Sequence, residues 1–403
     1  MKLVLAAALA LLSAGSARAA KGDDSDLSDP ILSAQSAAGL SLEGRRDGKA
    51  VVFPLSTPTT SSLLGRPGII TGRLVLIDRD GTTKAGRSAK VRLAGSGAPA
   101  GWTHTGPDGS FAVKAPAGTS WKIRASLDNR LWRLRSDSDA AYEWESAAVL
   151  SGADIGELSP SAGSENAKLG VLHLTYLDAV GFLEREADVK WWEKPLTVVW
   201  PADGDYFSSW QWSLHLTNAL AWDVVLHELG HAVMDGAMDA RTSGGSHKID
   251  ECYSAGLAWS EGWASFFAAA VHLSPDDADA KFEFMVPRRS PIRVENVPAD
   301  VCKGPTSEWR VFAGLWDLYD RHADGEAAAL GFGPIWKGTT GGVTSSIGDA
   351  WSLIASGLDP AARGAGENAM RLNTLLPPKV TLVKLPDLPR TPSRFFDGAR
   401  QTK

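Results

Sequence analysis

The chain has 403 residues, of which 44% are hydrophobic and 22% are charged, an ordinary composition for a globular protein. This length allows two or three domains with a substantial core. The net charge is −6 without a basic block, which argues against nucleic acid or an anionic membrane surface as a partner. The 16 tryptophans predict large apolar contacts in the core, and an aromatic groove for peptides or glycans is the alternative.

The N-terminus has the pattern of an export signal. Lys2 precedes an apolar run from residue 3 to 12, and Ala17-Arg18-Ala19 fits the small-x-small cleavage rule. We therefore expect residues 1–19 to be removed and the mature protein to be periplasmic or extracellular. The apolar run is too short to span a bilayer and no later segment is long enough, so we expect no membrane insertion. Residues 20–66 are rich in Ser, Ala, Gly and Asp, which predicts a disordered lead segment.

The next segments predict a multidomain α+β protein. Residues 67–128 alternate between apolar and polar positions and carry turn signals such as Asp80-Gly81, which predicts a small β-sandwich of immunoglobulin or transthyretin type. Residues 129–164 are acidic and rich in Ser, Ala and Gly, and we interpret them as a linker with room for one strand at 141–144. Residues 165–376 predict a mainly helical domain with a small sheet, and residues 377–403 predict a proline-rich tail.

Residues 227–231 have the sequence HELGH within an apolar, proline-free run that predicts a helix. His227 and His231 are four residues apart, so both imidazoles lie on one side of that helix and can bind one tetrahedral ion such as Zn²⁺. Zinc acidifies the water at its open position, and Glu228 is placed to take the proton of that water. The alternative is a buried helix with two hydrogen-bonded histidines.

Glu261 is the candidate for the third ligand. It stands alone in an otherwise apolar helical run, and burial of a lone carboxylate is costly without a partner. Small residues share its side of the predicted helix, which would let the two helices approach closely. These residues are Ser254, Ala258, Ser265 and Ala268.

Cys252 and Cys302 are the only cysteines. In an oxidising compartment they predict a disulfide that anchors the loop leading to Glu261, and two unpaired thiols are the alternative. Closing a loop of this length stabilises the folded state by about 4 kcal/mol in the chain-entropy model.

The order of these motifs resembles that of gluzincin metallopeptidases, and within them the fungalysin-like pattern, over roughly residues 165–360. The matching segments are HELGH, then Gly244-Gly245, EGWASFFA from Glu261, and LWDLY from Leu315. The resemblance implies a thermolysin-like endopeptidase for peptide or protein substrates, with Zn²⁺ held by His227, His231 and Glu261 and with Glu228 as general base. The segment Thr105-x-x-Asp108-Gly109-x-Phe111 resembles carboxypeptidase regulatory-like modules.

The resemblance also raises questions about the neighbours of the metal ligands. The family pattern has an aspartate four residues beyond the third ligand, where this chain has Ser265, so Asp223, Asp235 or Asp317 are candidates to orient a zinc histidine. A donor for the oxyanion is also needed, and the candidates are Tyr319 and His322 on a predicted helix that opens at residues 306–308 and runs to residue 322. The plain alternative is that Asp317 and Arg321 form a surface pair and Tyr319 lies in the core.

The strand predicted at residues 196–200 has Pro195 and Pro201 at its borders, which suits a sheet edge. In thermolysin-like enzymes the substrate lies along such an edge.

Taken together, these motifs predict an exported zinc endopeptidase. The alternative is an exported protein that keeps the zincin scaffold to bind peptides or glycans without cutting them. Its oligomeric state is left open.

Overall fold

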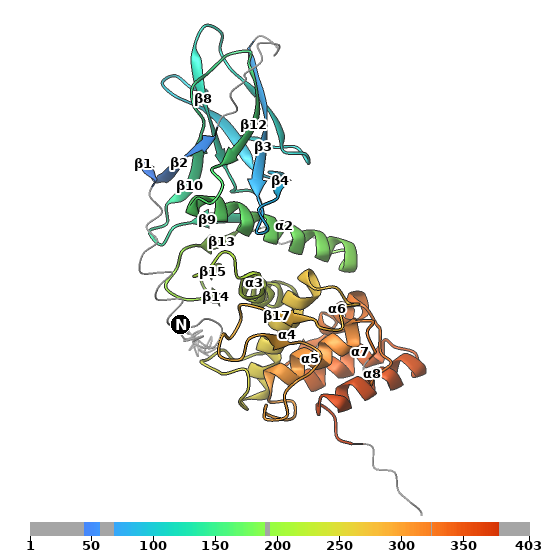
Figure 1. Cartoon of the computed structure of the whole chain (residues 1–403). Helices are drawn as coiled ribbons and strands as arrows, with labels where there is room; N and C mark the ends of the chain where they lie inside the picture. Colours follow the sequence, from blue (N-terminus) through green and yellow to red (C-terminus); the bar gives the residue numbers. More distant parts are fainter. Residues whose placement is uncertain (1–43, 57–67, 190–193, 324, 379–403) are drawn as a thin grey trace, which may run out of the picture.

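The computed structural model describes residues 44–56, 68–189, 194–323 and 325–378. A β-rich N-terminal region is followed by a helical C-terminal region, as expected for a multidomain α+β protein (Figure 1). Within these ranges, none of the helices combines the length and the apolar character that crossing a membrane requires. The predicted signal peptide, residues 20–43 and 57–66 of the lead segment and the tail from residue 379 lie outside the described residues.

The β-rich region contains two groups of paired strands. One group is β10, β8, β5 and β6, and the other is β12, β3, β7 and β4. The strand β2 joins them, because its residues 50–54 pair with β10 and its residues 55–56 pair with β12. The bounds of these strands are β1 (Arg45–Asp47), β2 (Ala50–Ser56), β3 (Ile69–Ile77), β4 (Thr83–Ala85), β5 (Lys90–Ala94), β6 (Thr103–His104), β7 (Ser110–Lys114), β8 (Ser120–Ser126), β9 (Trp132–Arg135), β10 (Ala141–Glu145), β11 (Val149–Leu150) and β12 (Asp154–Pro160).

Two sequence-based boundaries are wrong here. The segment 129–164 is not a linker, because it contains the strands β9 to β12. The lead segment is not wholly disordered, because β1 and β2 lie within it. The alternation that marks these strands is short: Trp132 and Leu134 are buried in β9, and Tyr142 and Trp144 are buried in β10. The strand expected at 141–144 corresponds to β10, whereas the surrounding Ser, Gly and Asp residues obscured the period of two in the other strands.

The sheet continues from the β-rich region into the helical region. β9 pairs in parallel with β13 (Leu196–Val199), and β13 pairs in parallel with β15 (Ser213–His215). β14 (Tyr206–Ser208) pairs with β15 and ends this path of strands. The prediction that the strand at 196–200 is a sheet edge is therefore wrong. Pro195 and Pro201 lie just outside β13, so they remove no hydrogen bond from its ladders.

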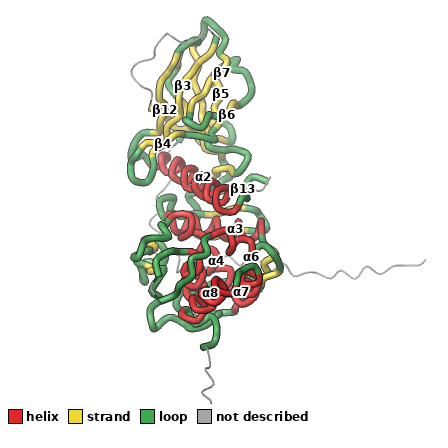
Figure 2. Tube along the Cα trace, turned by 90° about the vertical axis from the view of Figure 1, so that its right-hand side faces the viewer, coloured by secondary structure: helices red, strands yellow, loops and turns green. Residues whose placement is uncertain are grey.

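The helices gather around α3 and α4, and α2 lies between them and the strands of the β-rich region (Figures 1 and 2). The close contact of α2 with β3 occurs at Gly170, where a Cβ atom would lie 3.3 Å from Leu76 Cβ. Short strand pairs β16–β19 and β17–β18 complete this region. The bounds are η1 (Glu165–Ala167), α2 (Lys168–Ala187), α3 (Trp222–Ala237), β16 (Asp239–Ala240), α4 (Ala255–His272), β17 (Lys281–Phe282), β18 (Ile292–Arg293), α5 (Glu308–Tyr319), α6 (Phe332–Thr339), β19 (Val343–Thr344), α7 (Ile347–Ser356) and α8 (Pro360–Leu372).

Most tryptophans in the described ranges pack in the core, as the composition predicted. Trp132, Trp144, Trp200, Trp259 and others are almost completely buried. Trp210 is the clear exception, because its side chain is 90% exposed on the turn between β14 and β15. The tryptophans as a group therefore form no aromatic groove within this part of the chain.

His173 joins α2 to the sheet as a buried neutral histidine. Its Nδ1 accepts a hydrogen bond from Trp132 Nε1 at 3.3 Å, and its Nε2 lies 2.8 Å from the carbonyl oxygen of Arg87. Burial lowers the pKa of His173 to about 4 from its usual 6.5. Because the unfolded chain binds this proton first, the stabilising contribution is complete above pH 6.5 and is lost as the pH falls towards 4.

We therefore expect wild-type protein to lose about 3 kcal/mol more unfolding free energy than His173→Gln between pH 7 and pH 4. Urea unfolding at both pH values, in the presence of EDTA so that metal binding does not contribute, measures the difference. Equal losses in the two proteins would show that His173 does not carry this pH dependence.

Candidate metal centre

The centre is built from α3 and α4, which pack closely side by side. α3 carries His227, Glu228 and His231, and α4 carries Glu261. The close approach depends on Gly230, where a Cβ atom would lie 2.8 Å from Ala264 Cα. Ser254 caps α4 by accepting a hydrogen bond from the backbone N–H of residue 257. The tight contact lies at Ala264, which was not among the small residues expected on this side of α4 but precedes Ser265, which was.

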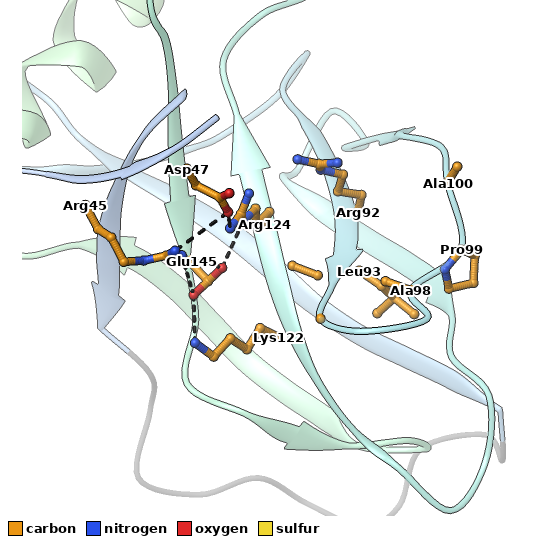
Figure 3. A pocket seen from close by; sticks show the side chains of 12 residues that line it. Arg45, Asp47, Arg92, Leu93, Ala98, Pro99, Ala100, Lys122, Arg124 and Glu145 are labelled. Carbon is orange, nitrogen blue, oxygen red and sulfur yellow. Dashed lines mark hydrogen bonds and ion pairs between the residues drawn. The ribbon is translucent and has the colours of Figure 1, made fainter. Parts of the chain in front are cut away.

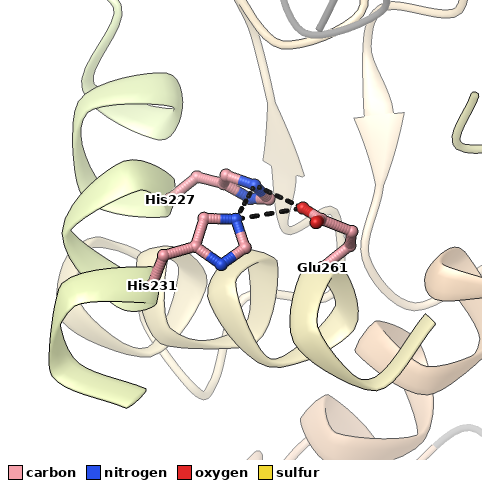
Figure 4. Close-up of side chains that lie close together, drawn as sticks. All are labelled: His227, His231 and Glu261. Carbon is pink, nitrogen blue, oxygen red and sulfur yellow. Dashed lines mark hydrogen bonds and ion pairs between the residues drawn. The ribbon is translucent and has the colours of Figure 1, made fainter. Parts of the chain in front are cut away.

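Three donor atoms converge between the two helices (Figure 4). His231 Nε2 lies 3.1 Å from His227 Nε2 and 3.0 Å from Glu261 Oε2, and His227 Nε2 lies 3.1 Å from the same carboxylate oxygen. Donors around a tetrahedral zinc ion with bonds of about 2.1 Å lie roughly 3.4 Å apart. The three atoms therefore form one face of a site that fits such an ion after a small expansion.

Serine hydroxyls hold the outer nitrogen of both imidazoles. Ser265 Oγ lies 3.0 Å from His227 Nδ1 and donates its own hydrogen to the sulfur of Met285 at 3.9 Å. Ser265 therefore accepts from Nδ1–H, which leaves the Nε2 lone pair of His227 directed into the centre. Ser260 Oγ lies 3.3 Å from His231 Nδ1. A hydroxyl thus stands where the family pattern has a carboxylate, and Ser260 is a neighbour that the sequence reasoning missed.

Burial favours a neutral imidazole at His227, and the neighbouring histidines favour an ionised carboxylate at Glu261. His227 is fully buried, which lowers its pKa to about 4. Burial alone would raise the pKa of Glu261, but the neighbouring histidines, among them His231 and His247, hold it well below its usual value. Two nitrogen lone pairs and an anionic oxygen facing one another repel unless a cation lies between them.

His247 is a further residue that the sequence reasoning missed. It is buried in the loop between α3 and α4, and its Nε2 lies 3.8 Å from Glu261 Oε2 and 3.2 Å from Glu308 Oε2 at the start of α5. Its Nδ1 lies 3.0 Å from the carbonyl oxygen of Gly245. The available signal was a histidine between HELGH and Glu261 in a chain with only eight histidines.

The loop that carries His247 is fixed at its far end. Cys252 and Cys302 form the expected disulfide, with their Cα atoms 5.3 Å apart. Asp250 accepts from the guanidinium groups of Arg288 and Arg289 at 2.7–3.1 Å, which holds the pKa of its carboxyl well below the usual value. The segment leading into α4 is therefore tied to two other parts of the chain.

The three aspartates suggested as partners of a zinc histidine lie elsewhere. Asp223 Oδ2 accepts from the backbone N–H groups of residues 283, 284 and 285, so it fixes the loop that supplies Met285. Asp235 lies on the exposed last turn of α3. Asp317 is buried on α5, where its Oδ2 accepts from Asn373 at 2.6 Å. The serines take the place that these carboxylates were expected to fill.

Tyr319 and His322 do not reach the centre, so the two candidates for an oxyanion donor are wrong. α5 begins at Glu308 beside His247, and Tyr319 lies eleven residues further, or roughly 16 Å along the helix axis. Its hydroxyl donates to the carbonyl oxygen of Ala270 near the end of α4 at 3.4 Å. His322 follows beyond the end of α5. A shared helix face was predicted, but the end of the helix nearest the centre was not.

Glu228 follows His227 on α3 and lies close enough to α2 for its charge to act on Tyr176. It is 1% exposed, whereas the side chain of His231 is 16% exposed, so the centre opens to solvent on the His231 side. Burial, and then the negative charge of Glu228, raise the pKa of Tyr176 on α2. The carboxylate of Glu228 is therefore almost fully shielded from water, one residue after the first metal-ligand candidate.

A separate hollow of about 770 Å³ in the β-rich region is an ion-pair network rather than a reaction centre (Figure 3). Arg124 is bound there by Asp47, by Glu143 at 3.2 Å and by Glu145 at 2.8 Å. Lys122 pairs with Glu145 at 2.8 Å. Because the cations are matched by carboxylates, the hollow is a poor site for an anionic ligand.

Comparison with known proteins places the centre in a family context. Residues 184–334 match the family model of the mycolysin C-terminal domain. The matched segment runs from the end of α2 to the start of α6 and contains both helices of the centre. The match supports a relationship with thermolysin- and fungalysin-like gluzincin peptidases. No curated protein matches the chain.

The contact at Gly230 gives a prediction for the mycolysin-like region. Gly230→Ala should destabilise the fold by about 1–3 kcal/mol and weaken metal binding, because the added methyl group pushes α4 and its Glu261 away from α3. Thermal unfolding and zinc titration measure both effects. Gly181→Ala in α2, where a Cβ atom meets nothing within 4 Å, is the control. Wild-type values in Gly230→Ala would mean that the helices do not need this approach.

Proposed function

We propose that this chain is an exported, zinc-dependent endopeptidase. The observation that carries the proposal is the convergence of His227 Nε2, His231 Nε2 and Glu261 Oε2 within 3.1 Å of one another. Glu228, the residue after His227 on the same helix, supplies a buried carboxylate. The match of residues 184–334 to the mycolysin C-terminal domain supports a peptidase rather than another metal protein. The signal-like sequence of residues 1–19 supports export.

The donor set suits zinc better than calcium or magnesium. Two imidazoles and one carboxylate are the ligands of catalytic zinc sites, whereas the hard cations prefer sets made of oxygen. When bound, a zinc ion lowers the pKa of water and polarises a substrate carbonyl. Ser265 and Ser260 keep each Nε2 directed inward, so the two imidazoles need little rearrangement to bind the ion.

The proton-transfer role falls to Glu228 in this proposal. As a general base it takes the proton of the attacking water, and as a general acid it returns that proton to the leaving amine. Its burial excludes bulk water, which strengthens its interactions with the developing charges. The histidines and Glu261 orient the reacting groups but do not exchange protons with them.

We place the substrate on the free edge of β14 rather than on β13. Among the described strands, β14 pairs with β15 alone. α3 packs against β14, so the unpaired edge of β14 belongs to a strand that contacts the helix of His227 and His231. Pairing of a peptide with a strand edge binds the backbone with little regard to sequence. The exposed Trp210 follows directly and offers an apolar surface for a substrate side chain.

Trp210→Ala should therefore raise KM for peptide substrates by roughly 3-fold to 10-fold while kcat and Tm stay the same, since the indole is 90% exposed in the free protein. Steady-state kinetics on a fluorogenic peptide measure this. Leu150→Ala removes another exposed apolar side chain, far from α3 in the β-rich region, and should leave KM unchanged. An unchanged KM in Trp210→Ala would remove the indole from the substrate site.

A casein digestion with purified mature protein tests the proposal. We expect cleavage that stops on addition of a zinc chelator and returns with added Zn²⁺. Intact casein with metal-loaded protein would contradict the proposal and favour the alternative of a zincin scaffold that only binds peptides or glycans. Mapping of cleaved bonds by mass spectrometry then shows the preference of the site.

A further inference from the structure

A second group of possible metal ligands lies at the opposite end of α5 from His247. Glu295 follows β18, and Asp320 and His322 follow the last residue of α5. One ligand atom from each of the three lies within 4.8 Å of the others. Asp320 is twelve residues beyond Glu308, or roughly 18 Å along the helix direction, so this group is separate from the candidate zinc centre.

The two carboxylates of this group are buried, and the group is held in position by hydrogen bonds. Asp320 is 1% exposed and Glu295 is 9% exposed. Trp316 Nε1 donates to Glu295 Oε1 at 3.0 Å, and the backbone N–H of His322 donates to Asp320 Oδ2 at 3.0 Å. The other oxygen of Asp320, Oδ1, and the Nδ1 atom of His322 are buried without a hydrogen-bond partner among the described residues. These two atoms are available to a ligand in the group.

Negative charge accumulates in this small space. Burial, followed by the charge of Glu295, raises the pKa of Asp320 to about 8, and the charge of the buried Glu326 contributes in the same direction. A single proton shared between two carboxylates neutralises only one charge and makes no use of the imidazole nitrogen. A divalent cation balances two carboxylates and accepts the lone pair of the imidazole at the same time.

We propose that Glu295, Asp320 and His322 bind a second divalent cation. The mixture of two carboxylates and one imidazole favours Zn²⁺ or Mn²⁺, because Ca²⁺ takes oxygen ligands. The cation ties the segment after β18 to the end of α5. Its role is structural, because α5 separates it from Glu228 and from the donors on α3 and α4.

Metal content of the full mature chain tests this directly. The protein is equilibrated with Zn²⁺ or Mn²⁺ and freed of loosely bound ions. Its metal content is then measured by elemental mass spectrometry. We expect two ions per chain in the wild type, one in the double variant Glu295→Gln/Asp320→Asn, and one in His231→Ala. Asp276→Asn, an exposed carboxylate near the same end of α5, is the control and should keep both ions. A wild type with one ion, which His231→Ala removes, would overturn the proposal.

A second measurement covers the case in which the double variant does not fold. His231→Ala disables the first centre, so any shift in its Tm on addition of Mn²⁺ reports on another site. We expect a rise of roughly 5 °C at saturating Mn²⁺, and no rise once the single change Asp320→Asn is added. The absence of a rise in His231→Ala would show that the group holds a proton instead of a cation. Neither result depends on peptidase activity, so a failure of this proposal can be distinguished from a failure of the proposed function.

Discussion

Replacing Glu228 by glutamine should lower kcat/KM for peptide hydrolysis by roughly 10³-fold or more while the protein still binds zinc. The amide has almost the shape of the carboxylate but cannot take a proton from water. Because the fall lies in the chemical step, kcat should decrease and KM should change little. Peptide kinetics together with metal content measure both halves of the prediction.

The matched control for this variant is Glu184→Gln, which changes an exposed glutamate on α2 and should behave as wild type. Glu228→Gln protein that digests peptides at the wild-type rate would remove Glu228 from the reaction. Loss of zinc together with activity would instead show that Glu228 helps to build the site.

Replacing Glu261 by alanine should weaken zinc binding by about 10³-fold or more, since one of three protein donors is lost and the two imidazoles cannot close the site. Activity should disappear with the metal and return only partly at high zinc concentration. Zinc titration by competition with a chromogenic chelator measures the affinity.

A second variant grades this effect. Glu308→Gln leaves the three donors in place but removes the charge that lies 3.2 Å from His247. We therefore expect its zinc affinity to fall by roughly 10-fold to 100-fold. If Glu261→Ala binds zinc as tightly as the wild type, the carboxylate is not a ligand. If Glu308→Gln equals Glu261→Ala, His247 and Glu308 carry more of the site than the geometry indicates.

The sequence was informative where the pattern is local. The spacing of His227 and His231 identified one face of one helix, and the lone carboxylate of Glu261 among apolar and small residues identified the facing helix. Both signals need only the period of an α-helix and the cost of burying a charge. The disulfide was expected because two cysteines occur in a chain whose first residues predict an export signal.

The pairing of strands that are far apart in the sequence could not be predicted from such local patterns. The strands β9 and β13 are about sixty residues apart and pair in parallel. The residues around Trp132 and Val198 therefore do not indicate which strand each of these strands pairs with. The same limit explains Asp223, whose carboxylate accepts hydrogen bonds from the backbone amides of a loop sixty residues away. His247 was missed for a similar reason, because a loop histidine has no periodic position that shows where it points.

The error with Tyr319 and His322 has a different cause. Helical spacing says which side chains share a face, but the position along the axis depends on how α5 packs against α4. Gly262 sets that packing, since a Cβ atom there would lie 2.5 Å from Val311 Cγ1 near the start of α5. The start of α5 is consequently at the centre, and its end, with Asp320 and His322, is at the second group of ligands.

Anomalous diffraction from crystals of the mature protein at the zinc absorption edge tests the central claim most directly. We predict a strong peak within bonding distance of His227 Nε2, His231 Nε2 and a carboxylate oxygen of Glu261. A zinc-soaked crystal without a peak between α3 and α4, or with Glu261 turned away from the ion, would contradict it.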